Sequence, residues 1–189
     1  AFATGKGPNS AVVAVTTGLV NRLNQGELEA VLAHELSHVK NRDMAILTIA
    51  SFISTLAFYF VRYNLYFGAF GGGNRRDSGG IMLIWIVSIA VWLVSFLLIR
   101  ALSRYREFAA DRGSAIITGQ PSNLTSALLK ISDVMPRIPN EDLRKVEGMN
   151  AFFIIPAAVS GSFLNLFSTH PSVEKRIAAL EKIQRELEF

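Results

Sequence analysis

Two long apolar segments dominate the pattern of hydrophobic and polar positions along the chain. Residues 44–60 contain no charged side chain, and Arg62 is the only charge before Phe67. Residues 81–99 are uncharged throughout, and Ser88 and Ser95 are their polar breaks. As a helix with a rise of about 1.5 Å per residue, either segment can cross a hydrocarbon core of about 30 Å. The alternative is a buried core helix, and it carries more weight for the first segment, which has several polar residues.

A Gly-rich polar stretch, residues 68–80, separates the two apolar segments. It is too rich in glycine for a helix or strand, so it predicts the turn of a transmembrane hairpin. It lacks the lysine followed by serine or threonine of a phosphate-binding loop, so we expect no nucleotide site there. The expected organisation is a hydrophilic domain whose first half is residues 1–43 and whose second half is residues 101–189, interrupted by a hairpin over residues 44–100.

A hairpin returns both of its ends to the same side of the membrane, and that side carries most of the nearby cations. The positive residues at its two ends are Lys40, Arg42, Arg100, Arg104 and Arg106. The opposite side has Arg62, Arg75 and Arg76. Because cytoplasmic flanks of membrane helices carry an excess of Lys and Arg, we expect a multi-pass protein of the cell membrane (inner or plasma) whose hydrophilic domain faces the cytoplasm.

Short elements are predicted before the hairpin. Residues 9–17 are β-branched and follow two glycines and a proline, which predicts a strand at a sheet edge or in a hairpin. Asn24 followed by Glu27 has the pattern of a capping box, which predicts a helix that begins there and runs past His38. The pattern leaves open a continuation of this helix into the first apolar segment.

The second half of the chain is expected to be mostly helical, so the fold class is mainly α with a small β-sheet (α+β). The helix of the second apolar segment is predicted to run on to Ile117 and to end at Gly119, with Pro121 beyond it. Further helices are predicted over residues 121–135, 140–148 and 172–188, the last of them amphipathic. Residues 150–158 are apolar and are compatible with a strand or with irregular structure.

Composition narrows the class of protein. The 189 residues include no cysteine, so disulfides and thiolate metal ligands are excluded. The net charge of +4 is modest, and no basic patch is interleaved with aromatic residues, so we expect no nucleic-acid partner. The chain begins with Ala1 and shows no signal peptide, so we expect it to be a piece of a longer protein.

The sequence His34-Glu35-Leu36-Ser37-His38 has the pattern H-E-x-x-H within a strongly helical stretch. Residues four apart lie on one face of a helix, so His34 and His38 can direct their imidazoles at one metal ion. Glu35 is placed to take a proton from a metal-bound water. The alternative is a charged helix with two incidental histidines, and further candidate ligands later in the chain argue against it.

A catalytic zinc site usually has three protein ligands and an open position for water, so a third ligand is required. The candidates are carboxylates and His170. Glu107 and Asp111 lie four apart on one predicted helical face, so Glu107 can bind the metal while Asp111 orients a histidine ligand. The alternative for this pair is a solvated charged face with ion pairs to Arg104.

These parts predict a hydrolytic reaction. Zinc lowers the pKa of a bound water toward about 7. Glu35 would accept the proton of that water during attack on a peptide carbonyl and pass it to the leaving amine. His170 is a candidate hydrogen-bond donor to the oxyanion that forms. The alternative for His170 is a surface residue that caps the last helix.

Three motifs together resemble the HtpX family of membrane zinc endopeptidases, which are relatives of the CAAX prenyl protease and of the mitochondrial Oma protease. The motifs are residues 34–38, Arg106-Glu107-Phe108-Ala109-Ala110-Asp111 and Thr169-His170-Pro171-Ser172-Val173-Glu174-Lys175-Arg176-Ile177. The resemblance covers nearly the whole chain, including the hairpin. Residues 1–5 resemble the segment that follows two N-terminal membrane helices of the family, and those helices have no counterpart here.

The resemblance implies a zincin-like metalloprotease domain of the gluzincin type, interrupted by the hairpin. It also implies proteolytic quality control of misfolded or unfolded membrane proteins, often under stress. It implies that His34, His38 and Glu107 bind Zn²⁺ and that Glu35 is the catalytic base. It also implies that Asp111 supports a metal ligand from outside the coordination sphere and that His170 and Arg176 line the site.

Extended or unfolded polypeptides are the expected substrates, and a lipid bilayer is the expected surroundings. Main-chain pairing of a substrate with an exposed strand gives loose sequence preference. The residues expected to pair in this way are Ala11, Val12, Val13 and Ala14. The sequence does not predict an oligomeric state.

Three other classes of protein remain as alternatives. An intramembrane metalloprotease carries H-E-x-x-H inside the bilayer, where the charges at Glu27, Lys40 and Asp43 would be costly. A CAAX-type prenyl protease would bring more spans and a large intramembrane chamber. A non-catalytic scaffold or holdase with structural zinc would fill all four metal positions and would not need Glu35.

Overall fold

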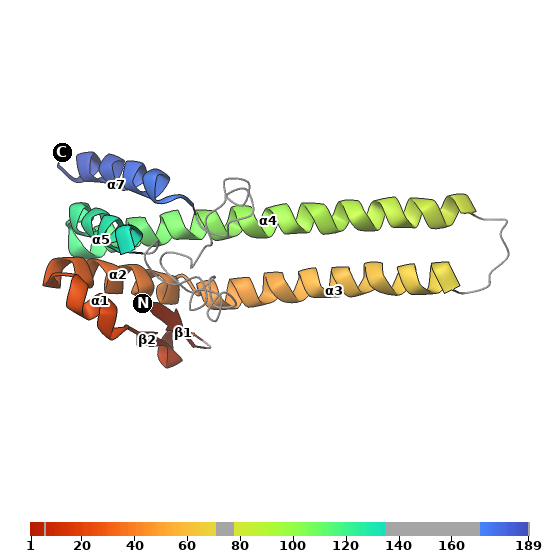
Figure 1. The fold of residues 1–189 in the computed structure, drawn as a ribbon, viewed down its shortest axis with the longest axis horizontal. Coiled ribbons are helices and arrows are strands. Elements are labelled where there is room, and N and C mark those ends of the chain that lie inside the picture. The colour runs from red at the N-terminus through yellow and green to blue at the C-terminus, as the bar shows by residue number, and fades with distance from the viewer. Residues whose placement is uncertain (6, 71–77, 135–170, 189) are drawn as a thin grey trace. The chain divides into compact units, whose positions relative to one another are not determined.

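The computed structural model describes residues 1–5, 7–70, 78–134 and 171–188 (Figure 1). The chain divides into two compact units, one of Ala1–Ala45 with the described residues from Ser103 onward, and one of Ile46–Leu102. The described residues are mostly helical with one two-stranded sheet, which confirms the expected mainly α fold. The predictions for residues 140–148 and 150–158 and for the centre of the Gly-rich turn lie outside the described residues.

The first unit begins with a short antiparallel hairpin. Strand β1 (Phe2–Thr4) pairs with β2 (Val12–Ala14), and Ala3 faces Val13 across the pair. A 3-10 helix, Pro8–Ser10, lies in the connection, where proline suits the first helical position. The hairpin contacts helix α2, so it packs against the helix that carries H-E-x-x-H.

The predicted strand over residues 9–17 is therefore right only at its centre. Its first residues belong to the 3-10 helix, and Thr17 is the first residue of helix α1 (Thr17–Arg22). The Thr16 side chain accepts a hydrogen bond from the backbone N–H of Leu19 and so caps α1. Threonine favours strands through its branched Cβ but also caps helices through its hydroxyl, and here the second property decides the structure.

Helix α2 (Gln25–Lys40) carries the predicted capping box. Asn24 Oδ1 accepts a hydrogen bond from the Glu27 N–H, and the Glu27 carboxylate accepts one from the Asn24 N–H, each at 2.9 Å. At its other end α2 does not continue into the apolar segment. Arg42 adopts φ 56° and its N–H bonds to the Val39 carbonyl at 3.1 Å, so the chain turns before the next helix begins.

Helices α3 (Asp43–Phe70) and α4 (Ser78–Thr118) contain the two apolar segments. Windows of each, Asp43–Phe60 and Ile86–Thr118, are long and apolar enough to cross a membrane, and only 6% of either window is buried. Such exposure is unlike that of a core helix in a soluble protein. As predicted, α4 runs past residue 100 and ends before Gly119, whose φ of 66° suits glycine.

Helices α5 (Pro121–Val134) and α7 (Val173–Leu187) complete the described part of the first unit, and both were predicted. Helix α5 contacts both α2 and α7 (Figure 1). Their shared apolar cluster contains buried side chains from the α1–α2 connection and from four helices: Leu23, Ala30, Val31, Ala115, Leu124, Ala127, Leu128 and Leu180. This cluster fixes α2, which positions the histidines, against the helices that carry the other site residues.

Glu27 joins α2 to α5 by polar contacts within this packing. Its side chain is buried, and it accepts hydrogen bonds from Ser126 Oγ at 2.5 Å and from Lys130 Nζ at 2.7 Å. Burial alone would raise the pKa of Glu27, but the hydrogen bonds from Lys130, Ser126 and the Asn24 backbone outweigh it and lower the pKa. The carboxylate therefore serves both as a helix cap and as a link between helices.

We expect Glu27→Ala to destabilise the first unit by about 2–3 kcal/mol, because it removes a cap and leaves two side-chain donors of α5 without their acceptor. For a domain of this size the melting temperature should fall by about 5–10 °C. Thermal unfolding of the detergent-solubilised protein measures this change.

The matched control is Glu29→Ala, on the exposed side of the same helix, where the side chain contacts Gln25. Its melting temperature should change little, because exposed pairs of this kind contribute about 0.2–0.5 kcal/mol. Equal melting temperatures for the two variants would contradict the role given to Glu27.

Candidate metal centre

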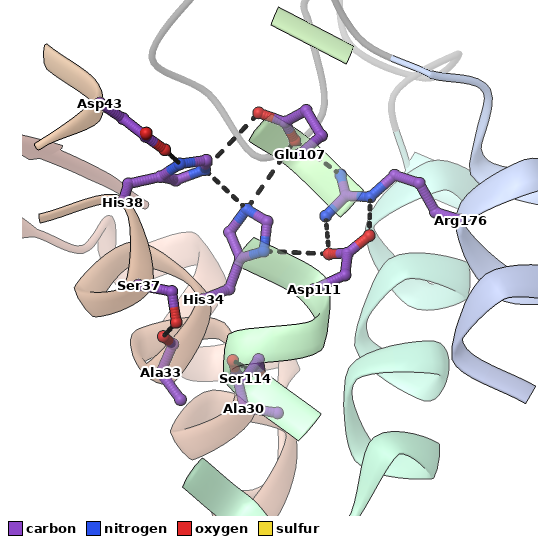
Figure 2. A network of polar contacts seen from close by, with 10 residues as sticks. All are labelled: Ala30, Ala33, His34, Ser37, His38, Asp43, Glu107, Asp111, Ser114 and Arg176. Atoms are coloured by element: carbon purple, nitrogen blue, oxygen red, sulfur yellow. Dashed lines mark hydrogen bonds and ion pairs between the residues drawn. The ribbon is translucent and has the colours of Figure 1, made fainter. Parts of the chain in front are cut away.

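The two histidines of α2 face each other one helical turn apart. His34 Nε2 lies 3.1 Å from His38 Nε2, and the two rings are nearly perpendicular. Helix α4 brings the Glu107 carboxylate to them, with Oε2 3.8 Å from His34 Nε2 and Oε1 3.5 Å from His38 Nε2. One ligand atom from each of these three residues lies within 4.8 Å of the others (Figure 2).

The chemistry of this donor set fits a divalent metal ion. Each histidine directs its Nδ1 at a separate carboxylate, so a proton on Nδ1 leaves a lone pair on each Nε2. Two nitrogen lone pairs and a carboxylate then converge on one point and repel one another unless a cation lies between them. Zn²⁺ takes histidine nitrogen and carboxylate oxygen at about 2.0–2.2 Å, distances that a triangle of this size permits.

The carboxylate that faces Nδ1 of His34 belongs to Asp111. Its Oδ1 lies 3.0 Å from His34 Nδ1, and its side chain is fully buried. Arg176 of α7, also buried, binds Asp111 through two contacts of 2.8 and 2.6 Å and lies 3.4 Å from Glu107. Burial lowers the pKa of Arg176, but Asp111, Glu107 and Glu35 raise it above its ordinary value. The cation therefore stays charged and holds both carboxylates in place.

The second carboxylate is Asp43, which the sequence analysis did not assign to the site. Its Oδ2 lies 2.6 Å from His38 Nδ1, and its Oδ1 lies 2.9 Å from Nε of Arg106. Burial lowers the pKa of His38, but the hydrogen bond to Asp43 and the charges of Glu107, Asp43 and Glu35 raise it overall. The electrostatic field that favours a proton on His38 also favours a metal cation beside it.

Helical spacing gives no signal for Asp43. It follows His38 by five residues, and α2 has already ended at Lys40. The chain turns at Arg42, which has φ 56°, and the Asp43 carboxylate then lies beside the His38 ring. An acidic residue just beyond the end of an H-E-x-x-H helix is the pattern that could have indicated it.

Glu35 lies between the two histidines in sequence and is also buried. Its side chain is 2% exposed, and Oε1 has no hydrogen-bond partner among the described residues. A buried carboxylate oxygen without a partner is costly unless a ligand or water meets it. Glu35 therefore has the features of a group that acts on a bound molecule.

Small residues allow α2 and α4 to approach closely enough for these contacts. A Cβ added to Gly113 would overlap Ser37 Oγ, and the Ser37 hydroxyl turns back to the Ala33 carbonyl of its own helix. At the next residue of α4, Ser114 Oγ donates to the Ala30 carbonyl of α2 at 2.7 Å (Figure 2). The sequence analysis did not identify this contact, which places Glu107 and Asp111 opposite the histidines.

The remaining residues expected at the site have different positions. Val12–Ala14 form β2, and Val12 is exposed. Ala11, just before β2, lines a small pocket together with His38 and Arg42, so the hairpin adjoins the metal centre. His170 lies outside the described residues, and its expected role stays a prediction.

Comparison with known proteins places the chain among peptidases. The model of Peptidase family M48 matches residues 1–184. The chain is 77% identical over 187 residues to "Protease HtpX homolog 2" of Methanosarcina acetivorans, covering 99% of this chain and 64% of that protein. It is 62% identical over 190 residues to "Protease HtpX homolog" of Moorella thermoacetica, covering 100% of this chain and 64% of that protein.

A more distant relative shows the same extent of match. "Protease HtpX homolog" of Pyrococcus abyssi is 44% identical over 191 residues, covering 99% of this chain and 64% of that protein. The chain thus spans about 64% of the length of these curated relatives. No solved structure matches it. The matches confirm the resemblance to the HtpX family, and the chain belongs to Peptidase family M48.

Proposed function

We propose that this chain is the catalytic part of a membrane-bound zinc endopeptidase. The observation that carries the proposal is the convergence of His34, His38 and Glu107 on one point, together with the buried Glu35, whose Oε1 has no hydrogen-bond partner among the described residues. A structural metal site has no use for such a carboxylate, whereas peptide hydrolysis requires a base. The family match supports the same conclusion, with the zincin-like arrangement as part of the proposal.

Zn²⁺ bound by His34, His38 and Glu107 would lower the pKa of a coordinated water toward about 7 and polarise a carbonyl group. Glu35 would accept the proton of the attacking water and pass it to the leaving amine. Asp111 and Arg176 keep His34 and Glu107 in position throughout. His170 is the proposed donor to the oxyanion, because it is the one histidine of the sequence outside the H-E-x-x-H motif and the family resemblance places it in the lining of the site.

Unfolded or extended polypeptides are the proposed substrates. Strand β2 pairs with β1 along one edge, and Ala11 shares a pocket with His38, so a peptide along residues 11–14 would reach the metal centre. Pairing through the main chain needs no particular substrate sequence. This suits quality control of misfolded membrane proteins, which is the proposed biological role.

Helices α3 and α4 are proposed to cross the cell membrane as a hairpin, with the metal centre on the cytoplasmic side. Their length, composition and exposed apolar surface support the two spans. The cations near the hairpin ends support the orientation.

We expect the full-length protein, purified in detergent, to bind about one zinc ion per chain, as a three-ligand catalytic site does. Glu107→Ala should lose most of that zinc, because it removes the one ligand of the three that comes from α4. Metal analysis measures the content, and the exposed Glu29→Ala variant is the control. Unchanged zinc in Glu107→Ala would indicate Asp111 or His170 as the third ligand.

Glu35→Gln should keep its zinc and lose casein hydrolysis by about 10²–10⁴-fold, because glutamine has nearly the same shape but cannot accept a proton. Zinc content and the rate of casein cleavage are measured on the same preparation, with and without a chelator. A zinc-loaded Glu35→Gln protein that cleaves casein at a near-normal rate would refute the role of Glu35 as the base. An unmutated, zinc-loaded protein that does not cleave casein would favour a scaffold or holdase.

His170→Ala should lower kcat by about 10²-fold or more, the effect of losing one oxyanion donor. Zinc content and the melting temperature should barely change. Normal activity would assign His170 to a structural role, and a joint loss of zinc and activity would make it a ligand.

A further inference from the structure

We propose that Asp43 is a positioning residue of the metal centre, which holds His38 in the orientation and tautomer that direct Nε2 at the metal, and that Arg106 holds Asp43 in turn. The inference rests on the proposed zinc site and adds two residues to it. Each histidine then contacts an aspartate, and each aspartate contacts an arginine. The two series are His34–Asp111–Arg176 and His38–Asp43–Arg106.

The contacts of Asp43 are divided between two partners. Oδ2 faces His38 Nδ1 at 2.6 Å, and Oδ1 faces Arg106 Nε at 2.9 Å, with the carboxylate 2% exposed (Figure 2 shows the His38 contact). A proton on Nδ1 that is donated to Oδ2 excludes the other neutral tautomer of His38. Nε2 is then left as an acceptor that faces His34 and Glu107.

The contacts of the other histidine, His34, provide an internal comparison. There Asp111 lies 3.0 Å from His34 Nδ1, and Arg176 binds Asp111 through its guanidinium. Metal-binding histidines commonly donate their second N–H to a carboxylate, which fixes the ring and raises its basicity. Asp43 and Arg106 repeat this arrangement on the other histidine, from a different part of the chain.

The backbone adopts an uncommon conformation at the residue that brings Asp43 back to the ring. Arg42 has φ 56°, which lies in the left-handed region of backbone conformation that residues other than Gly and Asn seldom adopt. This residue redirects the chain between the end of α2 and the start of α3. Asp43 thereby meets a ring of the preceding helix instead of pointing away from it.

A purely structural role is the alternative. Asp43 is an acidic residue in the first turn of α3, where it interacts favourably with the helix dipole, and it pairs with a nearly buried arginine. That role accounts for the contact to Arg106 and for the position in the helix. It does not account for the short contact to His38, so the two readings predict different effects on metal binding.

The test compares Asp43→Asn with Arg106→Gln in the full-length, detergent-purified protein. Asparagine has nearly the same shape as aspartate but carries no charge and can present its amide N–H to His38. Arg106→Gln breaks the same Asp43–Arg106 ion pair and leaves the carboxylate beside His38. The readouts are zinc affinity by competition with a chelator, the visible spectrum of the Co²⁺-loaded protein and the melting temperature of the zinc-free protein.

We expect Asp43→Asn to weaken zinc binding by about 10–100-fold and to alter the Co²⁺ spectrum. Arg106→Gln should have a clearly smaller effect on both readouts, while the two zinc-free variants melt at similar temperatures. Normal zinc affinity in Asp43→Asn would overturn the inference. Equal losses of affinity in both variants, in proportion to their melting temperatures, would also overturn it in favour of the structural role.

The outcome separates this inference from the proposed function. An unmutated protein that binds zinc, and loses it on His34→Ala, supports the zinc site whatever Asp43→Asn does. An unmutated protein that binds no zinc, or keeps it after His34→Ala, refutes the zinc site and the role of Asp43 together.

Discussion

The arrangement of the site depends on one electrostatic constraint, the convergence of two histidine nitrogens and a carboxylate on a single point. Each imidazole can present Nε2 as a ligand only if a proton stays on Nδ1, so each needs an acceptor behind it. The acceptors are Asp111 and Asp43, both buried, and a buried carboxylate is costly without a cation. Arg176 and Arg106 meet that need. The requirements of the proposed metal ion thus extend from the histidines to the aspartates and from these to the arginines.

These contacts determine which helices must pack against one another. His34 and His38 come from α2, whereas Glu107 and Asp111 come from α4, more than 60 residues later. The two helices approach closely because glycine and serine line their contact. A larger side chain at Gly113 would push α4 away from α2 and so separate Glu107 from the two histidines. Helix α7 enters through Arg176, and α5 supports α2 through its apolar cluster and Glu27. Packing places the ligands, and the ion pairs set their final orientation.

The sequence predicted what depends on short-range geometry. Histidines four apart on a helix, a capping box and a glycine after a helix each act within one or two turns. Long-range features escaped prediction for physical reasons. Asp43 reaches His38 through a turn at Arg42 that no periodicity indicates. Arg106 was counted among the cations that orient a membrane helix, yet it is nearly buried and paired with Asp43. The hydroxyl of Thr16 caps helix α1, so Thr17, the last residue of the predicted strand, is the first residue of that helix.

The contacts among His38, Asp43 and Arg106 lie at the boundary between the candidate metal centre and the apolar helices. Hydropathy places that boundary after residue 43, where the charged residues stop. Asp43 is also the first residue of α3, so its backbone position is set by the apolar helix, while its carboxylate contacts His38, a proposed metal ligand. Arg106, its partner, lies on α4 seven residues beyond the last residue of the second apolar segment. A change in the helical start at residue 43 would therefore move the carboxylate that orients His38. Residue 43 therefore has two functions, as the start of helix α3 and as the partner of His38.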